Sequence, residues 1–108
     1  MATGRLGADA LSATTNTTVY TVPADTFAVV TASICNRGSA DITVRLAVAS
    51  ADAPTNAEYI EYDTTLVANG TLERTGIVID AGKKIVAYAS TSDASVVVYG
   101  IETSTATV

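Results

Sequence analysis

The ionisable side chains that could act together gather in one stretch of this 108-residue chain, AEYIEYD followed by TLERTG. In an extended strand Glu61 and Asp63 project from the same face, as the paired carboxylates of a glycosidase or the ligands of a weak Ca²⁺ site do. The same pattern fits carboxylates on the wet face of a strand that pair with Arg74 on a neighbouring strand. We favour such cross-strand ion pairs for the acidic cluster formed by Glu58, Glu61, Asp63 and Glu73.

Other reactive groups are scarce. The chain has no histidine, which removes the usual general base near neutral pH and the commonest metal ligand. The single cysteine, Cys35, lies in the apolar run FAVVTASIC and is expected to be a small buried side chain, unable to form an internal disulfide. No glycine-rich phosphate-binding pattern occurs. We therefore expect a protein that is not an enzyme, with no catalytic, metal-binding or cofactor-binding residues and no cofactor.

Tyrosines are the remaining candidates for ligand contacts, because aromatic rings can hold sugars or single-stranded nucleic acid. The chain has no tryptophan and no lysine or arginine interleaved with these rings, so we expect them mainly in the core and at subunit interfaces. Tyr59 and Tyr62, three apart, should point to opposite faces of a strand, whereas Tyr88 and Tyr99 fall in neighbouring predicted strands and could form a cross-strand pair. The fifth ring is Tyr20.

The charge of the chain bears on its partners. The net charge is −5, and the six basic residues are scattered, which argues against binding to a phosphate backbone. No apolar run approaches the length of about 20 residues that crosses a bilayer, and the N-terminus lacks the apolar core of a signal peptide. We expect a soluble, unprocessed protein that binds neither nucleic acid nor membrane.

The elements that position the ionisable and aromatic side chains are repeated runs of β-branched, aromatic and small residues. Each run ends at Gly, Pro, Asn or Asp. Their spacing predicts an all-β fold, an antiparallel β-sandwich of jelly-roll or Ig-like type with about seven to eight strands and little or no helix. The expected strands are Thr17–Val22, Phe27–Asn36, Asp41–Ser50, Ala57–Leu66, Thr71–Asp80, Lys83–Ser90 and Ala94–Ile101.

Two of these strands differ in pattern. In DITVRLAV, residues 41–48, apolar and polar side chains alternate, as on a sheet with one covered and one wet face. In FAVVTASIC, residues 27–35, both parities are apolar or small, which indicates a central strand covered on both sides, by the core and by a loop or a neighbouring subunit.

The breaks between the runs carry turn residues that suit a reversal of direction. Arg37-Gly38-Ser39, Asn69-Gly70 and Asp80-Ala81-Gly82 offer residues that tolerate positive φ where two strands meet closely. The longest break, residues 51–56 around Pro54, is expected to carry the chain from one sheet to the other.

Residues 1–16 have only Leu6 and Leu11 as large apolar anchors. We expect them to form an N-terminal arm that is ordered by contact with something else, followed by a single β-sandwich domain at 17–108. Charged residues make up 16% of the chain, against a usual level of about 25%. A surface of small neutral side chains costs little to desolvate, so it favours packing against other protein copies.

The order of these motifs resembles small virion structural proteins of tailed bacteriophages, particularly those of marine cyanobacteria. The resemblance covers roughly residues 14–102. It is carried by the YTVP element, the apolar strand ending in CN, the AG turn before KKIVAYAS and the final strand VVVYGIE. It implies a β-sandwich that decorates the head or the tail of the particle, and it implies no catalytic residues.

This resemblance sets the expected partners and location. We expect a capsid decoration protein of the virion, assembled in the host cytoplasm, that contacts major capsid or tail subunits. It should be a homo-oligomer, with a trimer favoured because it fits the local three-fold points of a capsid. The alternatives are a tail or baseplate accessory protein, a carbohydrate-binding β-sandwich module, and a small hydrolase that uses Glu61 and Asp63.

Overall fold

The computed structural model describes residues 2–105 and places in them eight β-strands and one short 3₁₀ helix, η1. All strand pairs are antiparallel. The all-β sandwich is confirmed, and all seven strands expected from the sequence are present with closely similar bounds. The elements are β1 (Thr3–Ala10), β2 (Thr17–Thr21), β3 (Thr26–Asn36), β4 (Ile42–Ala49), η1 (Asn56–Glu58), β5 (Tyr59–Leu66), β6 (Thr71–Ile79), β7 (Lys84–Ala89) and β8 (Ala94–Ser104).

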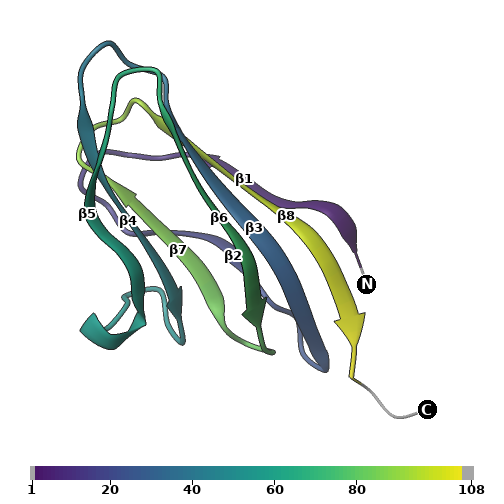
Figure 1. The fold of residues 1–108 in the computed structure, drawn as a ribbon. Helices are drawn as coiled ribbons and strands as arrows, with labels where there is room; N and C mark the ends of the chain where they lie inside the picture. Colours follow the sequence, from purple (N-terminus) through teal and green to yellow (C-terminus); the bar gives the residue numbers. More distant parts are fainter. Residues whose placement is uncertain (1, 106–108) are drawn as a thin grey trace.

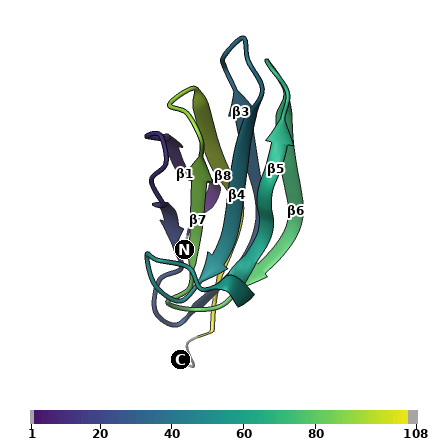
Figure 2. The same ribbon diagram turned by 90° about the vertical axis from the view of Figure 1, so that its left-hand side faces the viewer.

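The strands form two four-stranded sheets that pack face to face (Figure 1). The first sheet has the order β1-β8-β3-β6 and the second has the order β2-β7-β4-β5. In Figure 2 the second sheet lies toward the viewer, with β7, β4 and β5 in front of β8, β3 and β6. Eight strands in these two orders form a jelly roll, which was one of the two sandwich types expected.

The connections correct two expectations about the turns. Residues 51–56 were expected to cross between the sheets, but β4 and β5 are neighbours in the second sheet. The turns at Gly38, at Asn69-Gly70 and at Gly82 instead join strands of different sheets. Asn69 and Gly82 do adopt positive φ, 59° and 80°. Turn residues thus report a sharp reversal and not the sheet in which the next strand pairs.

The structure also corrects the expected N-terminal arm. Residues 3–10 form β1, which pairs with β8 of the same chain from Thr3 opposite Ile101 to Ala10 opposite Ser95. Directly after β1, the side chain of Leu11 is buried in the core at 2% exposure. The sandwich therefore includes part of the segment that was expected to form the arm. Its apolar pattern is weak, and backbone hydrogen bonds to β8 hold it in the sheet instead.

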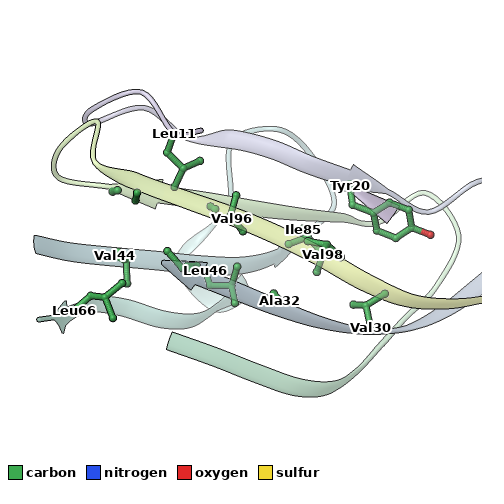
Figure 3. Packing of buried hydrophobic residues seen from close by; sticks show 14 of the residues in the cluster. Leu11, Tyr20, Val30, Ala32, Val44, Leu46, Leu66, Ile85, Val96 and Val98 are labelled. Atoms are coloured by element: carbon green, nitrogen blue, oxygen red, sulfur yellow. The ribbon is translucent and has the colours of Figure 1, made fainter. Parts of the chain in front are cut away.

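The core lies between the two sheets and is built mainly from aliphatic side chains, contributed by every second residue along a strand (Figure 3). β3 shows the alternation most clearly, since every second residue from Thr26 to Asn36 is buried and those between are half-buried. One aromatic ring, Tyr20, enters the core from β2, and its hydroxyl donates a hydrogen bond to the Glu102 carboxylate on β8. This bond joins the two sheets. Burial of the ring, and after it the bond to Glu102, raises the pKa of Tyr20.

Asn36 is a polar residue in the core, fully buried at the end of β3. Its amide nitrogen donates to the carbonyl oxygens of Ala40, Leu66 and Val67 at 2.9 to 3.1 Å, and its side-chain oxygen accepts from the Gly38 amide. The β3–β4 and β5–β6 connections meet at this end of the sandwich, opposite the end that carries η1 (Figure 1). Asn36 therefore fixes two loops by satisfying their carbonyl groups.

Candidate functional site

The two sheets differ in what lies over their outer sides, and these two surfaces are the candidate functional sites. We call the outer side of the first sheet the open face; its central residues are Val29, Val78, Tyr99 and Ile101. We call the outer side of the second sheet the covered face; its central residues are Arg45, Ala47, Tyr59, Tyr62, Val86 and Tyr88.

The open face carries a row of aliphatic side chains across three strands. Val29 on β3 lies opposite Val78 on β6 and opposite Ile101 on β8. Val78 is 70% exposed and Ile101 is 49% exposed, and Val29 between them is half-buried, so residues 2–105 leave this row largely uncovered. Large aliphatic side chains gathered in an exposed row mark an interaction surface more often than single ones do.

Charge is sparse on the open face. In the four strands of the first sheet, the outward positions carry only two charged residues. Arg5 lies on β1 opposite Tyr99, and Glu73 lies on β6 opposite Ser33. The Tyr99 hydroxyl donates a 2.9 Å hydrogen bond to Glu73, which raises the pKa of Tyr99. The face is thus apolar along one row and nearly neutral around it.

Cys35 lies on this same face, and its position corrects the expectation of a buried thiol. The alternation of β3 turns Asn36 into the core and leaves Cys35 half-buried, opposite Ser95 and Thr71. The outward residues of β3 are likewise half-buried within the chain. The strand is therefore covered fully on one side and only partly on the other.

The covered face has a small apolar cluster of its own. Ala47, Ala49 and Val86 project outward from β4 and β7, yet they are at most 2% exposed, and the ring of Tyr59 packs against them. Nearby, a carboxylate oxygen of Asp52 accepts a hydrogen bond from Thr18 at 2.6 Å and lies 3.7 Å from the ammonium group of Lys84. Asp52 of the β4–β5 connection thereby contacts β2 and β7 of its own sheet.

Beside this cluster Arg45 stands between two aromatic rings. Its guanidinium carbon lies 4.3 Å from the ring centroid of Tyr62 and 4.3 Å from that of Tyr88. Its Nε donates to Asp63 Oδ1 at 2.6 Å. The hydrogen bond with Asp63 is the main cause that raises the pKa of Arg45. One cation is therefore held by two rings and one carboxylate.

A bulge in β5 between Tyr59 and Glu61 brings Tyr59 and Tyr62 together, contrary to the expectation of opposite faces. The β4–β5 register shifts on both sides of the pair Leu46–Glu61, and Asp63 has a φ of 50°. Each extra residue in a bulge reverses the parity of those that follow. The two rings meet at 4.9 Å between centroids and at 81° between planes.

A second bulge, between Glu61 and Thr64, separates the two carboxylates that could have formed a catalytic pair. Asp63 binds Arg45, whereas Glu61 accepts hydrogen bonds from Thr64 and from Arg74. The Thr64 bond is the main cause that lowers the pKa of Glu61. Arg74 belongs to β6 of the first sheet, so its pair with Glu61 crosses the open edge of the sandwich and does not lie within one sheet as expected.

The tyrosine pair and η1 border a pocket of about 430 Å³, lined by Asn56, Tyr59 and Tyr62. The helix is held by a capping box, in which the Glu58 carboxylate accepts from the Thr55 amide at 2.8 Å. This bond is the main cause that lowers the pKa of Glu58. Sequence reasoning missed Asn56, although the T-x-x-E pattern at residues 55–58 is a signal of a helical turn.

The chain matches no protein-family model, no curated protein and no solved structure. Its fold and surfaces therefore carry the functional argument. Within residues 2–105 no group of three or more His, Cys, Asp or Glu side chains is arranged to hold a metal ion. Over the same residues, no helix has the length and apolar character of a bilayer-spanning segment.

The remaining tyrosine expectation is wrong. Tyr88 and Tyr99 lie in consecutive strands of the chain, but β7 belongs to the second sheet and β8 to the first. The two rings therefore lie on opposite outer faces. Tyr88 stacks on Arg45, and Tyr99 bonds Glu73.

Proposed function

We propose that this chain is a non-enzymatic structural protein of a bacteriophage virion that decorates the capsid and stabilises it through subunit–subunit contacts. The aliphatic row of exposed Val78 and Ile101 with half-buried Val29 between them, on the nearly neutral open face, carries the proposal. Burying apolar surface releases about 25 cal/mol per Å², and a face with two charged positions loses little to desolvation. The resemblance in the YTVP-to-VVVYGIE motifs points to the same class.

The first occupant of the open face in this proposal is an identical copy. Arg5 and Glu73 lie on opposite sides of Tyr99 on this face, so a copy rotated by a symmetry axis can place unlike charges together. A trimer built in this way would offer several identical contacts to a shell. Many weak contacts then act together, because each bound contact raises the effective concentration of the next.

The fold adds support by analogy. Jelly rolls with two Greek keys recur in viral capsid domains and in lectin domains. Fold by itself does not determine function, so the surface carries more weight than the topology.

The test begins with the mass of the purified protein in solution. We expect an oligomer, and we expect the double substitution Val78→Lys with Ile101→Lys to give a folded monomer. Tyr62→Ala on the covered face is the matched control and should leave the oligomer intact. The proposal fails if the wild-type chain is a monomer over the whole concentration range or if the double variant still assembles.

A second measurement tests the role in the particle. Adding the wild-type protein to virions that lack it should raise their resistance to heat and to osmotic shock, and the lysine double variant should not. Immunolabelling of intact particles separates capsid decoration from the tail or baseplate alternative. If protein is absent from purified virions, the structural role is wrong.

A further inference from the structure

The pocket at Asn56, Tyr59 and Tyr62 combines two features of ligand sites, aromatic walls and unused hydrogen-bonding groups. Its volume of about 430 Å³ lies in the range of roughly 300 to 1,000 Å³ that small-molecule sites occupy. Among residues 2–105, no hydrogen-bond partner is found for the Asn56 side-chain amide or for the hydroxyls of Tyr59 and Tyr62. These groups are therefore free to bond a ligand.

The arrangement of the two rings selects the shape of that ligand. Because the ring planes of Tyr59 and Tyr62 stand at 81°, a flat, ring-shaped molecule that stacks on one of them meets the other at its rim. Tyr62 is 55% exposed, which leaves ring surface available for stacking. The face of an aromatic ring is negative and attracts weakly positive C–H groups, and one side of a pyranose ring presents such groups while its rim carries hydroxyls.

The charges around the pocket select against ionic ligands. Arg45, whose guanidinium carbon lies 4.3 Å from the Tyr62 ring centroid, is already paired with Asp63. Glu58 is engaged by the backbone amides of Thr55 and Ser50. An anion would find Arg45 neutralised by Asp63, and a cation would find the carboxylates of Asp63 and Glu58 already engaged.

We propose that this pocket binds a neutral pyranose, as a single sugar or as the end of a neutral glycan. The sugar ring stacks on the tyrosine pair, and the Asn56 amide and the tyrosine hydroxyls bond its hydroxyl groups. The pocket belongs to the covered face and the proposed docking surface to the open face, so the two proposals are independent. A copy docked on the first sheet leaves the pocket on the second sheet accessible.

The experiment is an amide-resolved NMR titration of the full chain with a panel of neutral methyl pyranosides and with uronic acids as charged counterparts. We expect at least one neutral pyranoside to shift the resonances of residues 56–63 saturably. Tyr62→Ala should weaken that binding by roughly tenfold, the loss expected for one aromatic contact. Asn56→Ala keeps both rings and should weaken it less. Tyr99→Ala, which removes an exposed tyrosine from the open face, is the control and should bind as the wild type does.

Three outcomes would overturn the proposal. In the first, none of the neutral pyranosides shifts the resonances of residues 56–63 saturably. In the second, only the uronic acids bind, and in the third, the wild type and Tyr62→Ala bind equally well. Resonances outside residues 56–63 report whether each variant is folded. Because oligomer mass and sugar binding are measured separately, failure of one proposal is distinguishable from failure of the other.

Discussion

The two outer faces of this sandwich are each built from four antiparallel strands, yet the chain packs a small apolar cluster of its own over only one of them. On the covered face, Tyr59 seals three small side chains and Arg45 is stacked between two rings. On the open face, Val78 and Ile101 remain exposed. The strands thus provide two comparable surfaces, and the connections between them decide which surface is left for another molecule.

Topology explains the difference. The β4–β5 connection returns to its own sheet, so it can fold over the outer side of that sheet. The other connections between the eight strands cross from one sheet to the other and therefore close the ends of the sandwich. The first sheet has no returning connection and keeps its outer side bare.

The largest expected effect is a loss of stability when an aromatic ring is removed from the covered face. Tyr59→Ala should lower the free energy of unfolding by about 2 kcal/mol, because it uncovers Ala47, Ala49 and Val86. Urea denaturation followed by circular dichroism measures the change. Tyr99→Ala is the matched control from the open face and should cost clearly less. Equal losses would contradict the assignment of one face as covered.

Acid should weaken the covered side of the molecule. Folding lowers the pKa of Glu58 and Glu61 below the ordinary value of 4.5. Their stabilisation is therefore complete above that value, and it is lost as the pH falls through the lower folded pKa values. Unfolding curves taken from pH 6 downward, with pH as the only variable, should show this decline.

Glu58→Gln gives the control for the acid effect. Glutamine can still accept the capping hydrogen bond from Thr55, but it does not titrate. The variant should be less stable than the wild type at neutral pH and should lose less stability in acid. An identical pH dependence in both proteins would contradict the lowered pKa of Glu58.

A smaller effect is expected from the ion pair on the covered face. Arg45→Met keeps most of the apolar stem but removes the contacts with Asp63, Tyr62 and Tyr88. Stability should fall by less than in Tyr59→Ala, and part of the loss should disappear in high salt, which screens the wild-type pair. Thermal denaturation at low and high salt measures both. A loss independent of salt would assign the effect to packing alone.

The smallest effect on stability is expected on the open face. Val78→Lys should change the free energy of unfolding by less than about 0.5 kcal/mol, because the side chain is 70% exposed. The same substitution should weaken self-association, measured by sedimentation. A large loss of monomer stability would show that the chain itself uses this row.

Sequence patterns predicted a large part of this structure. The alternation in β4 and the turn residues around each run located seven strands. In the acidic cluster, Glu61 and Asp63 form the expected kind of ion pair, whereas Glu58 bonds backbone amides and Glu73 bonds the Tyr99 hydroxyl. The sequence was less informative about which residues form these ion pairs. Arg74 was expected beside Glu61 in one sheet, but it reaches Glu61 across the sandwich edge. The pocket was missed because the bulge between Tyr59 and Glu61 places Tyr59 and Tyr62 on one side.

The sequence by itself determined where the chain is extended and which side chains alternate, because both depend on neighbouring residues and on the period of two. Only the tertiary structure decided that Thr3–Ala10 is a strand, that β5 is bulged and that the β4–β5 connection returns to its own sheet. These features depend on hydrogen bonds between residues far apart in the chain. A register shift of one residue exchanges the faces of a strand, and no local pattern records which distant strand will be the partner.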